Sequence, residues 1–232
     1  MPQYCRMEGG RLGMTFDAVP VQQLNFYRKL LPESEFFDLS VPYRQIRALK
    51  SAYEIQQLKR SGEKLSSVFS LVPEFLRVGM SELDLAAEFE YRLRKKGGER
   101  YARMRAFNQE LALGLAVSSG AASYGFFDGA VIGAGLSGAS PQGASLQEIN
   151  KNRPVLLDYT GVFNGYIADM TRMFVIGDLD AELKRAFEVA LEIQRSLQQA
   201  LKPGAICEGL FYKAENIAKD ARLSEFFYED AR

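Results

Sequence analysis

Two aspartates lie eleven positions apart, on either side of a strong turn signal. Asp158 and Asp169 flank the dipeptide Asn164-Gly165, which favours a two-residue hairpin turn because both of its positions need a positive φ. With this turn, Asp158 lies opposite Thr171 and Thr160 lies opposite Asp169. Side chains alternate between the faces of a strand, and opposed residues share a face. The spacing therefore predicts all four side chains on one face of a hairpin.

Two carboxylates on one face could bind a cation. Diagonal neighbours in an antiparallel pair lie roughly 7–8 Å apart, and from there they can converge on one cation or on two cations about 3.5–4 Å apart. Without a cation the two charges would repel each other. Two alternatives stay open at this point. Alternating Asp and Thr is also typical of a solvated sheet face, and a turn shifted by one residue would put the acids on opposite faces.

The composition excludes several other kinds of site. The 232 residues include 29 basic and 29 acidic side chains and no histidine. A Ser-His-Asp triad and a histidine-ligated zinc site are therefore excluded within this polypeptide. Zero formal charge and the lack of a long apolar run argue against nucleic-acid and membrane partners. Cys5 and Cys207 are far apart, which is typical of a reduced, cytoplasmic chain.

Helix signals surround the hairpin. Ser51–Glu54 is a capping box that predicts a helix ending at Gly79, and Ser81–Asp84 predicts the start of a second helix. Two more helices are expected after the hairpin, at about 181–201 and about 208–221. Two strands are expected before the hairpin, at 101–107 and 111–117.

Residues 1–45 resemble the end of another folded unit, because they are too few to bury a core of their own. Apolar residues recur at loose helical spacing from Leu12 to Leu31, and Phe36–Leu39 is typical of a short strand.

The glycines of Gly133–Gly138 spell G-x-G-x-x-G, with Asp158 further along the chain. This pattern is typical of dinucleotide binding and makes a dinucleotide-dependent oxidoreductase an alternative function. That function needs a helix that begins among the glycines. Pro141 and Gly143 would interrupt such a helix, so we interpret the glycines as part of an irregular loop over Ser118–Ser145.

The hairpin segment LDYTGVFNGYIADMTRMFVIGDL resembles the metal-binding hairpin of the pita-bread-fold metallopeptidases, the group of Xaa-Pro aminopeptidase, prolidase and creatinase. Three further segments resemble this group, at 46–63, 77–98 and 201–220, and the similarity spans roughly 39–228. The resemblance implies an α+β protein with an incomplete pita-bread (creatinase/aminopeptidase) fold, an antiparallel sheet with helices on one face. Residues 1–45 would be the remnant of the N-terminal domain, and 46–232 the first part of the catalytic domain.

The resemblance also implies a function. Such enzymes hold two divalent ions, with manganese expected first and cobalt or zinc as alternatives, and a bridging water attacks the peptide bond before proline. Asp158 would bind the first ion, Asp169 would bridge both, and Thr171 would hydrogen-bond near the water. Carboxylate ligands suit manganese. The substrate would be a proline-containing peptide, and the intact protein is expected to be a homodimer.

The chain departs from this family in its ligands. The family completes its site with a histidine and two glutamates that have no match here, and it commonly has a substrate-binding histidine where this chain has the Gly-rich segment 118–143. We therefore expect a truncated form that binds metal weakly and does not cleave peptides. A non-catalytic binding module with the same fold is the alternative.

Overall fold

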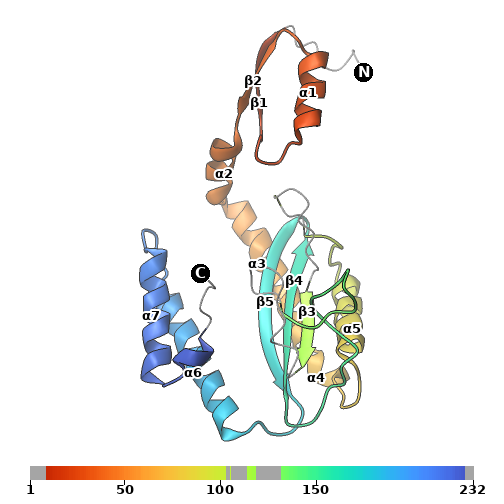
Figure 1. Ribbon diagram of the computed structural model, residues 1–232, viewed down its shortest axis with the longest axis vertical. Coiled ribbons are helices and arrows are strands. Elements are labelled where there is room, and N and C mark those ends of the chain that lie inside the picture. The colour runs from red at the N-terminus through yellow and green to blue at the C-terminus, as the bar shows by residue number, and fades with distance from the viewer. Residues whose placement is uncertain (1–8, 103–104, 106–113, 119–131, 228–232) are drawn as a thin grey trace. The chain divides into compact units, whose positions relative to one another are not determined.

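The structure, a computed structural model, describes residues 9–102, 105, 114–118 and 132–227 (Figure 1). The chain divides into two compact units, one of residues 1–149 and 155–174 and the other of 150–154 and 175–232. The expected domain boundary near residue 45 falls inside helix α2 (Ser40–Ala48), and this boundary stays a prediction.

The first elements form a small parallel pair. Strand β1 (Gly10–Met14) pairs with β2 (Ser34–Asp38), and helix α1 (Val21–Leu30) connects them. The expected strand at Phe36–Leu39 is confirmed, with an earlier start. The helix predicted from Leu12 to Leu31 is wrong in its first part. Residues 12–14 pair with β2, and the helix begins only after Pro20.

The next helices form the support for the hairpin. Helix α3 (Ala52–Phe69) begins with the expected capping box, and α5 (Glu82–Lys95) begins after Ser81. The prediction of one helix up to Gly79 is wrong, because α3 ends at Phe69 and the short helix α4 (Val72–Phe75) follows. Pro73 explains the break, since a proline ring clashes with the carbonyl four residues earlier, here that of Phe69.

The described residues form a second sheet with the order β3-β4-β5. Its strands are β3 (Gly114–Ser118), β4 (Pro154–Phe163) and β5 (Tyr166–Val175). Strand β3 runs antiparallel to β4, and a two-residue turn makes β4 and β5 antiparallel as well. Of the strand expected at 111–117, residues 111–113 lie outside the described residues. Of the strand expected at 101–107, residues 103–104 and 106–107 also lie outside them, and residues 101, 102 and 105 are not part of a strand.

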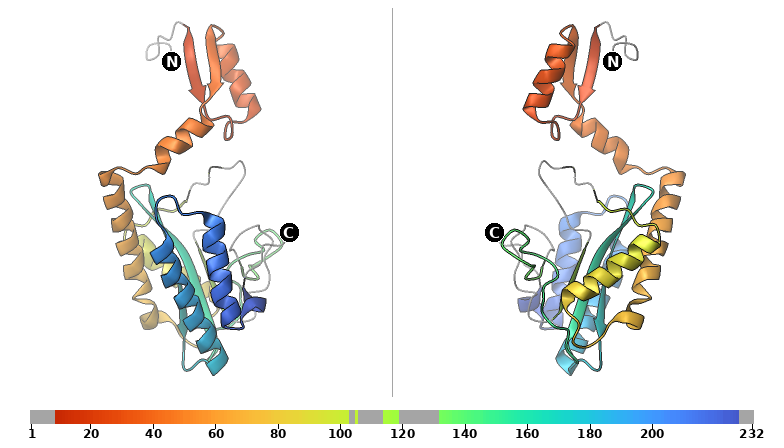
Figure 2. Two further views of the ribbon diagram at one scale, coloured as in Figure 1. Left: turned by 90° about the vertical axis from the view of Figure 1, so that its left-hand side faces the viewer. Right: turned by 90° about the vertical axis from the view of Figure 1, so that its right-hand side faces the viewer.

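Alternate residues of β4 face a core. The buried residues on this face are Val155, Leu157, Tyr159 and Gly161. Helices α3 and α5 pack together against the same face (Figure 2). The ring of Phe89 on α5 stacks on Tyr159 at 4.3 Å between centroids, and a Cβ on Gly161 would lie 3.2 Å from Leu65 on α3. The other face of β4 is therefore the one that carries Asp158 and Thr160.

The second unit holds two helices that pack on each other. Helix α6 (Ala181–Ala200) starts at its cap Asp180, and α7 (Cys207–Asp220) follows. Both agree with the predicted ranges to within one residue. A 3-10 turn at Ser224–Phe226 comes after α7. Among the helices in the described part of the chain, none combines the length and the apolar composition needed to cross a membrane.

The segment after the G-x-G-x-x-G pattern is a loop. In residues 132–149 no helix follows the glycines. A Cβ on Gly135 would lie 2.1 Å from the carbonyl oxygen of Ser140, so this glycine allows the loop to fold back on itself. The helix N-terminus that a dinucleotide pyrophosphate needs is not formed here. Residues 119–131 of the expected loop lie outside the described residues.

Candidate metal centre

The turn between β4 and β5 has the predicted geometry. Asn164 has a φ of 52° and Gly165 a φ of 74°, as a type I′ turn requires. The turn is fixed from two sides. The Asn164 side chain donates to Gln57 on α3 at 3.5 Å, and the Gly165 amide donates to the Glu99 carboxylate at 3.0 Å.

Hydrogen bonds across the hairpin confirm the predicted register. Thr171 donates to Oδ1 of Asp158 at 2.6 Å, and Thr160 donates to Oδ1 of Asp169 at 3.2 Å. The structure thus brings all four predicted side chains together on one face of the hairpin, and the shifted turn is excluded. Their roles in metal binding stay predictions.

The two aspartates differ in their surroundings. Asp158 lies on the central strand, directly opposite Leu115 of β3, whose side chain is only 5% exposed and belongs to an apolar cluster with Val117. Burial raises the pKa of Asp158 above its usual value, and the charge of Asp169 adds to this, while the hydrogen bond from Thr171 acts in the opposite direction. Asp169 lies on β5 and is exposed.

The donor set is small and consists of oxygen atoms. Each threonine hydroxyl contacts Oδ1 of its aspartate, so the Oδ2 atoms of Asp158 and Asp169 are left as ligands. Within the described residues, no group of three or more His, Cys, Asp or Glu side chains could hold a metal ion. The hairpin alone therefore offers two hard ligands.

Sequence reasoning missed a buried carboxylate that holds this region together. Glu82, in the first turn of α5, is fully buried. It accepts hydrogen bonds from the amide and hydroxyl of Ser118 at the end of β3, and from those of Ser145 in the following loop. These partners lie 36 and 63 positions away. No local pattern in the sequence could have revealed them.

Comparison with known proteins gives a family match. Residues 56–230 match the sequence profile described as metallopeptidase family M24. Among curated proteins, the chain is 29% identical over 198 residues to the Xaa-Pro dipeptidase of Lactobacillus delbrueckii subsp. lactis, covering 84% of this chain and 47% of that protein. It is 27% identical over 186 residues to the "Probable dipeptidase PepE" of Mycobacterium tuberculosis, covering 79% and 43%.

A solved structure shows the same fold. The X-Pro aminopeptidase of Thermotoga maritima superimposes with a TM-score of 0.76 at 21% identity, over 93% of this chain and 55% of that chain. The expected α+β, pita-bread fold is confirmed for the part that is matched. The chain spans about half the length of the curated relatives it matches.

Proposed function

Because the chain belongs to metallopeptidase family M24, we propose that its hairpin contributes two carboxylate ligands to the two-metal centre of a peptidase that hydrolyses the bond before proline. The observation that carries this proposal is the pairing of Asp158 and Asp169 on one face, each fixed by a threonine hydroxyl. The names of the relatives, an Xaa-Pro dipeptidase among them, support the choice of substrate.

The donors fit hard divalent ions. Asp158 and Asp169 would hold the metal through carboxylate oxygens, which suit manganese, with cobalt or zinc as alternatives. Two such ions, when bound, would lower the pKa of a water molecule and stabilise negative charge on the substrate. Loss of the Asp158 proton is required for binding, and its raised pKa makes the affinity for metal fall as the pH is lowered.

The two threonines orient the ligands. An outer partner of this kind fixes the ligand and raises metal affinity. Thr171, which the family resemblance puts beside the reacting water, donates to Asp158 at 2.6 Å, and we assign it a positioning role. A proline-containing peptide is the proposed substrate. The homodimer of the intact protein stays a prediction.

We further propose that the 232-residue chain by itself binds manganese weakly and does not turn over substrate. Its sequence contains no histidine, and its hairpin face offers two carboxylates. Two carboxylates do not fill the coordination spheres of two ions.

Titration of the metal-free chain with Mn²⁺, followed by electron paramagnetic resonance, tests the ligand assignment. The wild type is expected to bind, whereas Asp158→Asn and Asp169→Asn lose binding. Asp178→Asn serves as a control because that side chain is 92% exposed and lies outside the hairpin. Equal binding by all four proteins would contradict the assignment.

A binding module without catalysis is the second candidate function. The absence of histidine from the sequence favours it. The same titration separates the two candidates, because a module that does not use metal is expected to bind no Mn²⁺ at the hairpin.

A further inference from the structure

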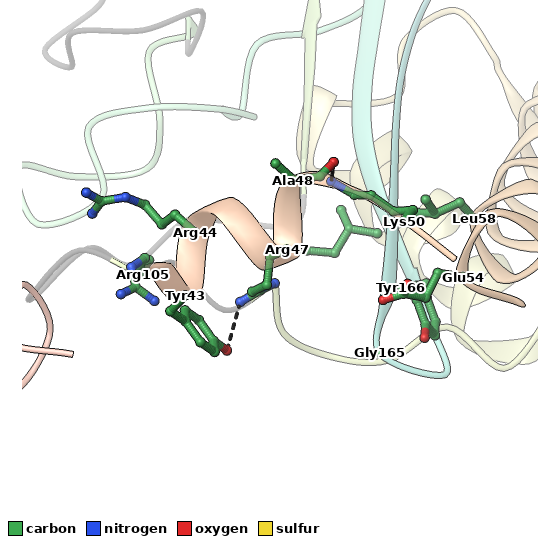
Figure 3. A pocket seen from close by; sticks show the side chains of 11 residues that line it. Tyr43, Arg44, Arg47, Ala48, Lys50, Glu54, Leu58, Arg105, Gly165 and Tyr166 are labelled. Atoms are coloured by element: carbon green, nitrogen blue, oxygen red, sulfur yellow. Dashed lines mark hydrogen bonds between the residues drawn. The ribbon is translucent and has the colours of Figure 1, made fainter. Parts of the chain in front are cut away.

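A pocket of about 500 Å³ lies within the first unit, where α2, the start of α3 and the turn of the hairpin meet (Figure 3). This volume is typical of sites for small molecules, about 300–1,000 Å³. Gly165 and Tyr166 supply the hairpin side of the pocket, and Leu58 on α3 adds an apolar wall. The pocket is therefore lined by residues other than the two aspartates.

The lining carries an excess of positive charge. Arg44, Arg47, Lys50 and Arg105 line the pocket, while Glu54 is the carboxylate among the lining residues that the structure describes. This excess is local, since the whole chain has no formal net charge. A concave site lined by charges of one sign concentrates ligands of the opposite sign.

Two of the four cations share a single carboxylate, and all three of these side chains are partly exposed. Asp17 pairs with Arg44 and with Arg105, the second at 2.7 Å. Within the described part of the chain, neither Arg47 nor Lys50 has an ion pair. Arg47 donates to the Tyr43 hydroxyl at 3.3 Å and Lys50 to the Ala48 carbonyl at 3.2 Å. These two cations are thus the ones left for a ligand.

Several contacts fix the charged groups in place. The guanidinium of Arg47 lies 5.4 Å and that of Arg105 lies 5.0 Å from the centre of the Tyr43 ring. Figure 3 shows Arg47 beside Tyr43 and the ammonium nitrogen of Lys50 beside the carbonyl oxygen of Ala48. Glu54 accepts from the Ser51 amide at 2.7 Å as part of the capping box. The hydrogen bonds from Ser51 lower the pKa of Glu54, and the charges of Lys50 and Arg47 act in the same direction from beyond ion-pair distance.

We propose that this pocket binds a small oxyanion that carries two or more negative charges on carboxylate or phosphate groups. Arginine presents donors that match both groups, and lysine adds a point charge. The site is independent of the proposed metal centre and of peptidase function. Its ligand would make direct ion pairs with Arg47 and Lys50, which interact with Glu54 only at longer range.

Calorimetric titration of the metal-free 232-residue protein at low salt tests the proposal. Citrate and inorganic pyrophosphate serve as separate probes, so that tighter binding of one identifies the ligand group as carboxylate or phosphate. Arg47→Gln with Lys50→Gln is expected to weaken binding by about tenfold or more, because charge-assisted hydrogen bonds are lost. The matched control is Lys59→Gln with Arg60→Gln, which removes the same two charges from exposed positions of α3 and leaves the affinity unchanged.

Glu54→Gln gives a test of opposite sign. It removes the negative charge from the pocket and keeps a side chain that capping boxes accept. The affinity for the anion is expected to rise by about threefold at low salt. Misfolding does not strengthen binding, so this variant remains informative even where the double variant does not fold. Failure of both probes to bind, or equal weakening by the control, would overturn the proposal.

Discussion

Asp158 is held in surroundings that oppose its charge. It lies beside the buried Leu115, and burial raises its pKa above the usual 3.8. A carboxyl group with a raised pKa in the folded state stabilises the fold fully below its unfolded-state pKa, and this stabilisation is lost as the pH rises through the folded-state value. At neutral pH the charged side chain therefore lowers the free energy of unfolding of the metal-free protein.

The first prediction follows for Asp158→Asn. This variant is expected to melt at a higher temperature than the wild type at pH 7 without metal, because the cost of burying a charge is gone. The difference shrinks as the pH falls and disappears below about pH 3.8, where the wild-type side chain is also neutral. Thermal unfolding between pH 3.5 and 8 measures this, with Asp178→Asn as the exposed control. A lower melting temperature at pH 7 would contradict it.

The second prediction concerns the hydroxyl of Thr171. Thr171→Val removes the 2.6 Å hydrogen bond to Asp158 and keeps the size of the side chain. Loss of such an outer partner typically costs about 10–100-fold in metal affinity. We expect a decrease in that range in the Mn²⁺ titration, whereas Thr171→Ser retains the hydroxyl and most of the affinity. If valine and serine bind alike, Thr171 does not orient Asp158.

At the scale of elements, the hairpin turn fixes which face carries the aspartates. The third prediction is that Gly165→Ala lowers the free energy of unfolding by about 1 kcal/mol, because Gly165 has a φ of 74°. A Cβ there meets no atom within 4 Å, so the cost comes from the backbone alone. Gly138→Ala is the matched control, since its Cβ also has open space and its φ is not positive. Chemical denaturation of both variants measures the difference.

The fourth prediction concerns the carboxylate that joins α5, β3 and the loop before β4. Glu82→Gln puts an amide group where the four donors of Ser118 and Ser145 converge. The amide nitrogen of glutamine would then face hydrogen-bond donors in a buried site. We expect this to lower the free energy of unfolding by about 3 kcal/mol. Glu88→Gln on the same helix removes only an exposed pair with Arg92 and is expected to cost about 0.5 kcal/mol or less. Similar denaturation midpoints would show that Glu82 is not essential to this junction.

The elements that could be predicted are those with local causes. The turn follows from Asn164-Gly165, and the start of α3 follows from Ser51 and a glutamate three residues later. The features that were missed depend on distant partners. Strand β1 is stabilised by pairing with β2, 24 positions further on, and Glu82 is bound by serines from two other segments. Sequence spacing does not encode such contacts.

At the scale of the whole molecule, the match to metallopeptidase family M24 and the geometry of the hairpin carry different information. The family match covers residues 56–230, while the chain spans about half the length of its curated relatives. The family therefore supports the type of chemistry. The ability of this hairpin to support metal-dependent hydrolysis depends on its own residues. This ability can be tested apart from the rest of the chain.

The fifth prediction uses a chimera for this purpose. Residues 154–177 of this chain would replace the matching hairpin of the Xaa-Pro dipeptidase from Lactobacillus delbrueckii subsp. lactis, to which the chain is 29% identical. The chimera is expected to hydrolyse an Xaa-Pro dipeptide with Mn²⁺, because the turn and the threonine bonds orient both aspartates within the hairpin itself. The 232-residue chain alone is expected to show no turnover in the same assay.

Two variants of the chimera make this test specific. Loss of an outer partner typically reduces activity by about 10–100-fold. Asp158→Asn is expected to reduce kcat/KM by more than this, because it alters a metal ligand itself. Asn164→Asp also changes one charge, but it keeps an Asp-Gly pair that the same turn accepts, so activity is expected to persist. A chimera that folds and binds Mn²⁺ without activity would show that the hairpin of this chain can hold metal but cannot support the reaction.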